Sequence, residues 1–96
     1  MFSKKNKFLL LFLFVVADGI YADISSNKET AAVGETITLT WSSSASSCAA
    51  FEDWSGGKSG NGSEQVEVAK LQWNVYGITC GGVSEWKYVW GIEATS

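Results

Sequence analysis

The sequence predicts an all-β fold: a small antiparallel β-sandwich closed by one disulfide and preceded by a signal peptide. Three observations predict it. Several short segments alternate apolar and polar residues, glycines separate these segments at close intervals, and helical periodicity is nearly absent after residue 22. With 96 residues the chain has room for one domain, which we place at 23–96 behind a leader at 1–22.

The amino end has the features of a secretory signal. A basic start is followed by an apolar run over 8–17, and this run is too short for a membrane span, which needs roughly 20 apolar residues. A buried core helix is the weaker interpretation, because the run is apolar on every face. We expect cleavage after Ala22, with Ala17 and Gly19 as alternatives. The mature chain is then secreted, periplasmic or displayed at the cell surface, with no membrane insertion.

The clearest strand is 36–41, where three threonines alternate with Ile37, Leu39 and Trp41. The apolar set should face the core and the threonines should face water. The preceding residues 23–30 are polar and are expected to form a loose edge, and Val33-Gly34-Glu35 indicates a turn.

Four segments follow in order. Residues 49–51 can form a short strand. Residues 55–63 include four glycines and predict a flexible loop, with Asn61-Gly62 suited to a tight turn. Residues 64–68 predict a strand with Val66 and Val68 inward, and residues 73–80 predict another with Asn74, Tyr76, Ile78 and Cys80 on one face.

Gly81-Gly82 turns the chain into a last strand over 86–94. Trp86, Tyr88, Trp90, Ile92 and Ala94 share one side of it.

The two cysteines, Cys48 and Cys80, read as a disulfide in an exported chain, the alternative being two free buried thiols. A bridge closing about 33 residues stabilises a fold by roughly 3.5–4 kcal/mol in the chain-entropy model. That matters for a domain of this size, whose core alone seldom supplies more than about 3–5 kcal/mol.

Several of these segments together resemble a known family. They are the run Val33-Gly34-Glu35-Thr36-Ile37-Thr38-Leu39-Thr40-Trp41-Ser42-Ser43-Ser44, then Ser47-Cys48, Trp54-Ser55-Gly56, Val66-Glu67-Val68 and Tyr76-Gly77-Ile78-Thr79-Cys80-Gly81. In this order they are similar to the motifs of small bacterial immunoglobulin-like extracellular modules. The resemblance implies a sandwich held by a Cys48–Cys80 bridge and an extracellular or envelope location. Trp41 precedes the first cysteine, unlike the tryptophan of antibody domains, and the last strand is richer in aromatic residues than such modules usually are.

The aromatic residues are the candidate binding residues. Trp86, Tyr88 and Trp90 stand about 6.6–7 Å apart along one strand face, which approximates the repeat of stacked sugar rings. The favoured interpretation is that most of this strip fills the core, because each buried ring removes on the order of 150–250 Å² from water. Five tryptophans are nevertheless many to bury, so one or two should be exposed. Trp54 either caps the end of the sandwich or is an exposed anchor.

Composition argues against other classes of function. The chain has no histidine, so imidazole metal sites and histidine-based triads are excluded. Residues 23–96 contain 4 Lys, no Arg and 9 acids, a net charge of 4 − 9 = −5, which disfavours nucleic acid as a partner. The acids Glu52, Asp53 and Glu64, near Asn61, match no calcium loop. We expect no enzyme activity, no metal and no cofactor.

The sequence therefore favours an exported binding or adhesion module with a protein or cell-envelope partner and one or two exposed tryptophans as anchors. Two other hypotheses stay open. One is a structural or assembly module that pairs through its edge strand, and the other is a glycan-binding module that uses the Trp86, Tyr88 and Trp90 strip.

Overall fold

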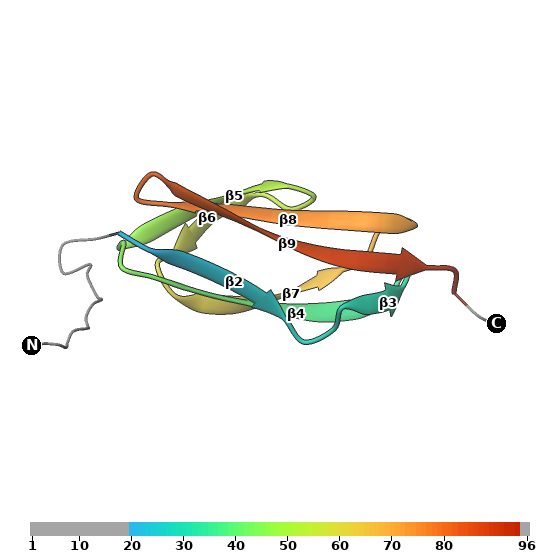
Figure 1. The fold of residues 1–96 in the computed structure, drawn as a ribbon. Helices are drawn as coiled ribbons and strands as arrows, with labels where there is room; N and C mark the ends of the chain where they lie inside the picture. Colours follow the sequence, from blue (N-terminus) through green and yellow to red (C-terminus); the bar gives the residue numbers. More distant parts are fainter. Residues whose placement is uncertain (1–19, 95–96) are drawn as a thin grey trace, which may run out of the picture.

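A computed structural model describes residues 20–94, which form two β-sheets packed face to face (Figure 1). The three-stranded sheet has the order β2-β4-β7 and the five-stranded sheet has the order β3-β9-β8-β5-β6. The strands are β2 (Ala22–Ser26), β3 (Thr30–Ala32), β4 (Thr36–Ser43), β5 (Ser47–Glu52), β6 (Gly56–Ser59), β7 (Gly62–Glu67), β8 (Gln72–Cys80) and β9 (Val83–Ile92). Residues 20–94 contain no helix, so the predicted all-β sandwich is confirmed. Residues 1–19 of the predicted signal peptide lie outside the described residues.

Alternation in the sequence produces the inner surface of the sandwich. Ile37, Leu39 and Trp41 of β4 are buried, as their pattern predicts. The predicted inward set of β8 is buried too, with Tyr76 and Ile78 at its centre. Val68 is fully buried and Val66 partly, which confirms the inward side of the strand predicted at 64–68.

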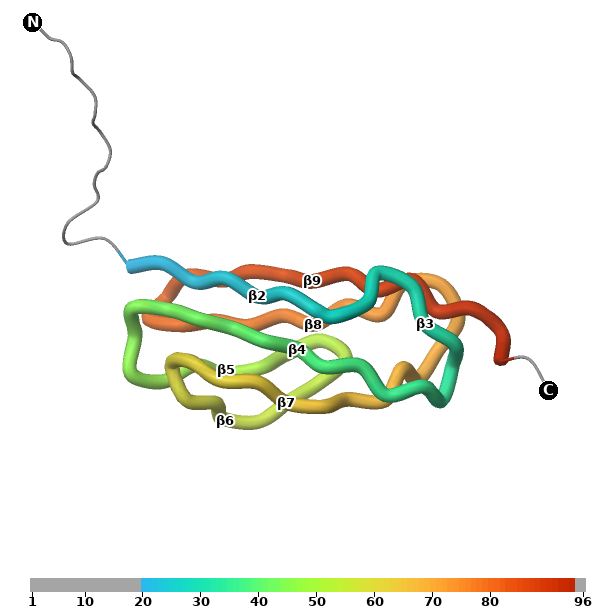
Figure 2. The backbone as a smooth tube through the Cα atoms, turned by 90° about the horizontal axis from the view of Figure 1, so that it is seen from below, coloured from blue at the N-terminus to red at the C-terminus, as the bar shows by residue number. Residues whose placement is uncertain are grey.

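The first described strands divide between the two sheets. Figure 2 shows β2 and β9 along the same side of the molecule, with β3 following where the chain crosses over. β2 pairs with β4 in antiparallel fashion, whereas β3 pairs with the last strand in parallel, with Thr30 opposite Trp90. This one parallel pair departs from the purely antiparallel sandwich that the sequence predicts. The expected loose edge at 23–30 is instead a regular edge strand followed by a short connection.

The prediction of a flexible loop at 55–63 is wrong. β6 lies within it and pairs with β5, and β7 begins at its end. Two of its glycines allow close packing: a Cβ on Gly60 would lie 1.9 Å from the Ala45 carbonyl oxygen, and a Cβ on Gly62 would lie 3.0 Å from the Trp41 ring. Tertiary pairing thus outweighs the low strand propensity of a glycine-rich segment.

The expectation that most of the aromatic strip on β9 fills the core is also wrong. β9 pairs with β8 so that Val89 lies opposite Asn74 and Trp90 lies opposite Trp73. Directly opposed residues point to the same face of a sheet. Since Asn74 points inward, Val89 points inward with it, and the strip of Trp86, Tyr88, Trp90 and Ile92 points outward.

The core joins the two sheets through three rings. Trp54, in the connection after β5, packs edge-to-face on Trp41 of one sheet at 5.5 Å and on Tyr76 of the other at 6.4 Å, measured between ring centroids. Its indole N–H donates to the Gly77 carbonyl at 2.7 Å. Trp41 in turn donates to the Ser59 carbonyl at 2.8 Å. Both indole donors are therefore satisfied inside the sandwich.

Candidate contact surface

The outer face of the five-stranded sheet exposes a cluster of large apolar side chains. The exposed fractions are 53% for Trp73, 46% for Trp86, 51% for Tyr88, 37% for Trp90 and 44% for Ile92. Phe51 of β5 is partly buried on the same face, where its register partner is Gly77. We call the outer surface formed by these six residues the aromatic face. Large contiguous apolar surfaces are uncommon on monomers and mark contact sites.

The rings of the aromatic face pack against one another edge to face. Trp73 meets Trp90 at 4.8 Å between centroids with the planes 77° apart, and it meets Tyr88 at 5.9 Å with the planes 85° apart. Phe51 meets Trp86 at 5.8 Å and 88°. The cluster is therefore a ridged surface with rings in crossed orientations, and these contacts hold the side chains in place before any partner arrives.

None of the strand positions around the aromatic face is charged. Strand register places sixteen residues on the outer face of the five-stranded sheet, and all of them are aromatic, aliphatic, small or hydroxyl-bearing. They are Thr30, Ala32, Ser47, Ala49, Phe51, Gly57, Ser59, Trp73, Val75, Gly77, Thr79, Ser84, Trp86, Tyr88, Trp90 and Ile92.

The opposite face of the sandwich is polar. Thr36, Thr38 and Thr40 alternate along β4, flanked by Asp23 of β2 and Glu67 of β7. The two outer faces of the molecule thus differ sharply in chemistry, and apolar contact is available on one of them only.

Trp54 is not an exposed anchor. It is 7% exposed, and the Lys58 ammonium lies 4.7 Å from the centroid of its ring while pairing with Glu64 at 2.6 Å. Its role is to close the sandwich beside β6, which matches the capping interpretation. We correct the assignment of Trp54 as a binding residue for this reason.

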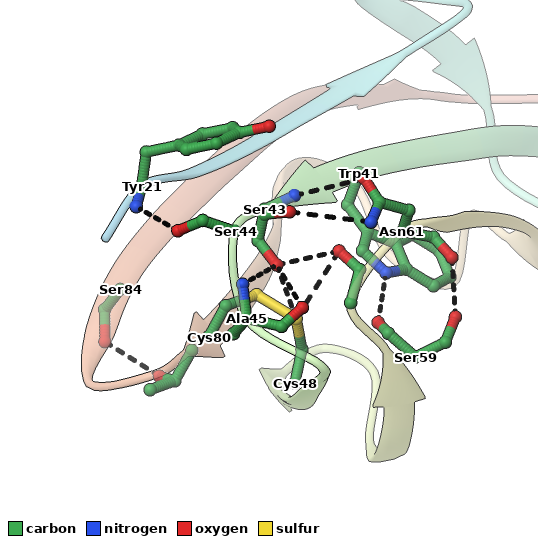
Figure 3. Close-up of a disulfide and its surroundings, with 12 residues drawn as sticks. Tyr21, Trp41, Ser43, Ser44, Ala45, Cys48, Ser59, Asn61, Cys80 and Ser84 are labelled. Atoms are coloured by element: carbon green, nitrogen blue, oxygen red, sulfur yellow. Dashed lines mark hydrogen bonds between the residues drawn. A yellow bond between two sulfur atoms is a disulfide. The ribbon is translucent and has the colours of Figure 1, made fainter. Parts of the chain in front are cut away.

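The Cys48–Cys80 disulfide is formed, but it lies within one sheet. The two residues are directly opposed on β5 and β8, with their Cα atoms 4.2 Å apart. Figure 3 shows the bridge beside Ser43, whose hydroxyl donates to the Gly60 carbonyl at 2.8 Å and accepts from the Ala45 N–H at 3.2 Å. The bridge fastens β5 to β8 and does not connect the two sheets.

The loop acids have local partners. Asp53 accepts from the Val75 N–H at 2.7 Å and pairs with Lys70 at 3.1 Å, and Asn61 accepts from the Ser43 N–H at 3.3 Å. Within residues 20–94 no group of three or more acids and cysteines is placed to hold a metal ion. These side chains organise loops.

Among residues 20–94, two ionisable groups have shifted pKa values. A hydrogen bond from Lys28, followed by one from the Ala32 N–H, lowers the pKa of Glu35. Burial, and then the nearby Asp53 carboxylate, raises the pKa of the Tyr76 phenol. Both groups are structural, since one holds the turn before β4 and the other lies in the core.

The part of the chain that the structure describes has no internal pocket, and none of its segments is a helix able to cross a membrane. The chain matches no known family model, no curated protein and no solved structure. The candidate site therefore rests on the outer sheet face alone.

The sequence named three of the exposed residues, Trp86, Tyr88 and Trp90, but placed most of them in the core. It did not name Trp73 or Phe51 as site residues. The signal for Trp73 was available, because a strand whose even residues face the core must turn residue 73 outward. Phe51 had no such signal, since its position over Gly77 depends on the pairing of β5 with β8.

Proposed function

We propose that this chain is an exported, non-enzymatic binding module of the immunoglobulin-like type that contacts a protein partner through its aromatic face. The observation that supports the proposal most is that the aromatic face is uncharged and exposes its rings while the core is already filled by other residues. Aromatic side chains on a stable scaffold are typical anchors of protein interfaces.

The strand order supports the immunoglobulin-like assignment. In such domains the first, second and fifth strands share one sheet, and the third, sixth and seventh share the other. Here β2, β4 and β7 form one sheet while β5, β8 and β9 lie together in the other. Two features depart from that pattern. The fourth strand of constant-type domains lies with the first, second and fifth, whereas β6 lies beside β5 in the other sheet. The antibody disulfide joins the two sheets, whereas the Cys48–Cys80 bridge stays within one.

A protein partner is favoured over a glycan by the ring geometry. A sugar ring stacks on an open aromatic face, and successive sugars need successive faces in similar planes. The planes of Trp73 and its two neighbours are instead 77° and 85° apart, so these rings do not form a row of parallel faces. Ridged apolar surfaces of this kind suit the side chains of another protein.

Edge-to-edge assembly has less support. β3 covers the end of β9 by pairing with Trp90–Ile92, and Lys87 of β9 pairs with Glu29 at 2.8 Å beside that edge. A short covering strand and a charge at the edge both discourage pairing with another strand.

Export is proposed from the basic start, the short apolar run and the disulfide, which persists in oxidising compartments. Expression of the full chain, followed by mass measurement of the product outside the cytoplasm, tests it. We expect a chain that has lost its leader and has an oxidised bridge. An unprocessed chain that stays inside the cell would contradict export.

The contact surface is tested by cosedimentation of the oxidised protein, at about 0.1 µM, with the envelope fraction of the cells that produce it. We expect saturable binding that Trp90→Ser weakens at least tenfold while Thr40→Ser, on the polar face, leaves it unchanged. Protease treatment of the envelopes should abolish binding. Binding that survives the protease and follows added soluble polysaccharide would favour the glycan hypothesis, and equal effects of both substitutions would overturn the assignment of the face.

A further inference from the structure

We propose that the protein partner of the aromatic face is a second copy of this chain, so that two sandwiches pack through their five-stranded sheets about a two-fold axis. The inference depends on the proposed function in one respect, because it needs the aromatic face to be a protein contact surface. It adds the identity and the symmetry of the partner. Three features of the surface support it: its charge, its relief and its size.

Charge restricts how two copies can approach. Residues 23–96 have a net charge of 4 − 9 = −5, so identical chains repel one another over most orientations. The polar sheet face includes Asp23 and Glu67, which would meet their own copies in a face-to-face pair. The aromatic face has no charge to repel its copy, and its rings remain in contact with water when the chain is alone.

The relief of the surface changes along the strands. Large rings occupy one end, where Trp73 lies opposite Trp90, and extend to the centre, where Trp86 packs on Phe51. Small side chains occupy the other end, where Thr79 pairs with Ser84 on one side and with Ala49 on the other. A two-fold axis that lies between the two sheets and crosses the strands at mid-length places the raised end of each copy over the low end of its partner. A symmetric dimer requires such a match of one patch with itself.

The size of the surface suits a weak specific dimer. The five strands contain 32 residues, which at about 3.3 Å per residue and a strand spacing of about 4.8 Å give a face of roughly 500 Å² per copy. The total of about 1,000 Å² for two copies lies at the lower limit for specific interfaces, where weak complexes are found. Sheets that pack face to face at about 10 Å are an ordinary arrangement in sandwiches, so the backbone geometry poses no obstacle.

Sedimentation velocity of the oxidised protein between about 1 and 200 µM tests the proposal. We expect the mass to rise from monomer to dimer across this range, and dilution should shift the tryptophan emission to longer wavelength as Trp73, Trp86 and Trp90 return to water. Tyr88→Lys should weaken dimerisation at least tenfold. Thr40→Lys adds the same charge to the polar face and should leave dimerisation unchanged.

A second variant tests the geometry without removing a ring. Ala49→Lys changes only the low end of the face, where the side chain is exposed, and should also weaken dimerisation at least tenfold. Circular dichroism checks that each variant remains folded. A dimer insensitive to both face substitutions would overturn the inference, and so would a strict monomer at every concentration.

The two experiments together distinguish failure of the dimer inference from failure of the proposed function. A monomer whose envelope binding still depends on Trp90 keeps the contact surface but rejects the second copy as its partner. A monomer with no binding that depends on the aromatic face rejects both.

Discussion

At the scale of single residues, glycines decide where rings can lie. Gly77 lies directly beneath Phe51, and a Cβ at position 77 would lie 2.5 Å from the phenyl ring. Because real Cβ atoms do not approach so closely, only glycine at position 77 leaves room for the Phe51 ring where it packs on Trp86. The absence of a Cβ at position 77 therefore determines how closely the Phe51 ring packs on the sheet at the centre of the aromatic face.

Gly77→Ala should destabilise the domain by about 1–3 kcal/mol, because it overpacks the contact with Phe51. The free energy of unfolding from urea titration measures this. Gly57→Ala is the matched control, since a Cβ there would have no atom within 4 Å. Similar losses from both substitutions would contradict the steric explanation.

Tyr76 gives the fold a dependence on alkaline pH. Burial and Asp53 raise the pKa of its phenol, so the folded state favours the neutral form. The neutral phenol stabilises the fold fully below the pKa of an unfolded tyrosine, about 10. This stabilisation is lost as the pH rises through the higher pKa of Tyr76 in the folded state. We expect the free energy of unfolding to fall above about pH 10 and Tyr76→Phe to flatten that fall. Thr40→Ser, which removes no titratable group, should leave the profile as in the wild type.

At the scale of elements, the first strand extends beyond the predicted cleavage point. The Tyr21 N–H donates to the Ser44 hydroxyl at 3.0 Å, and the Ser44 N–H donates to the Tyr21 carbonyl at 3.2 Å. Ala22 is the first residue of β2 and packs against the core. A leader cut after Ala22 would remove these contacts, whereas a cut after Gly19 would preserve them.

A chain that begins at Ile20 should be more stable than one that begins at Asp23 by about 1–2 kcal/mol, the value of two hydrogen bonds at the end of a strand. Urea midpoints of the two oxidised chains provide the measurement. Equal midpoints would show that β2 does not need residues 20–22. Cleavage after Ala22 would then leave the free energy of unfolding unchanged.

At the scale of the whole molecule, the disulfide and the core stabilise different parts of the sandwich. The bridge fastens β5 to β8 within one sheet, while Trp41, Trp54 and Tyr76 connect the sheets through ring contacts and buried area. Loss of the bridge should therefore lower stability without dissolving the contact between the sheets.

Replacing both cysteines by alanine should reduce the free energy of unfolding by about 3.5–4 kcal/mol on the chain-entropy model. At low temperature the near-ultraviolet circular dichroism from the packed core rings should persist. Loss of that signal under every condition would mean that the sheets depend on the bridge after all.

The sequence by itself determined the all-β class, the inner faces of β4 and β8, and the pairing of the cysteines. These follow from local alternation, from β-branched residues and from the presence of only two thiols. The tertiary structure alone decided which side of β9 faces the core, because alternation defines two sides of a strand and only the register with β8 distinguishes them. It also decided that a glycine-rich segment forms β6, since pairing with β5 supplies hydrogen bonds that local propensity cannot indicate. The aromatic face exists for the same reason: the rings were evident in the sequence, and their exposure depends on strand register.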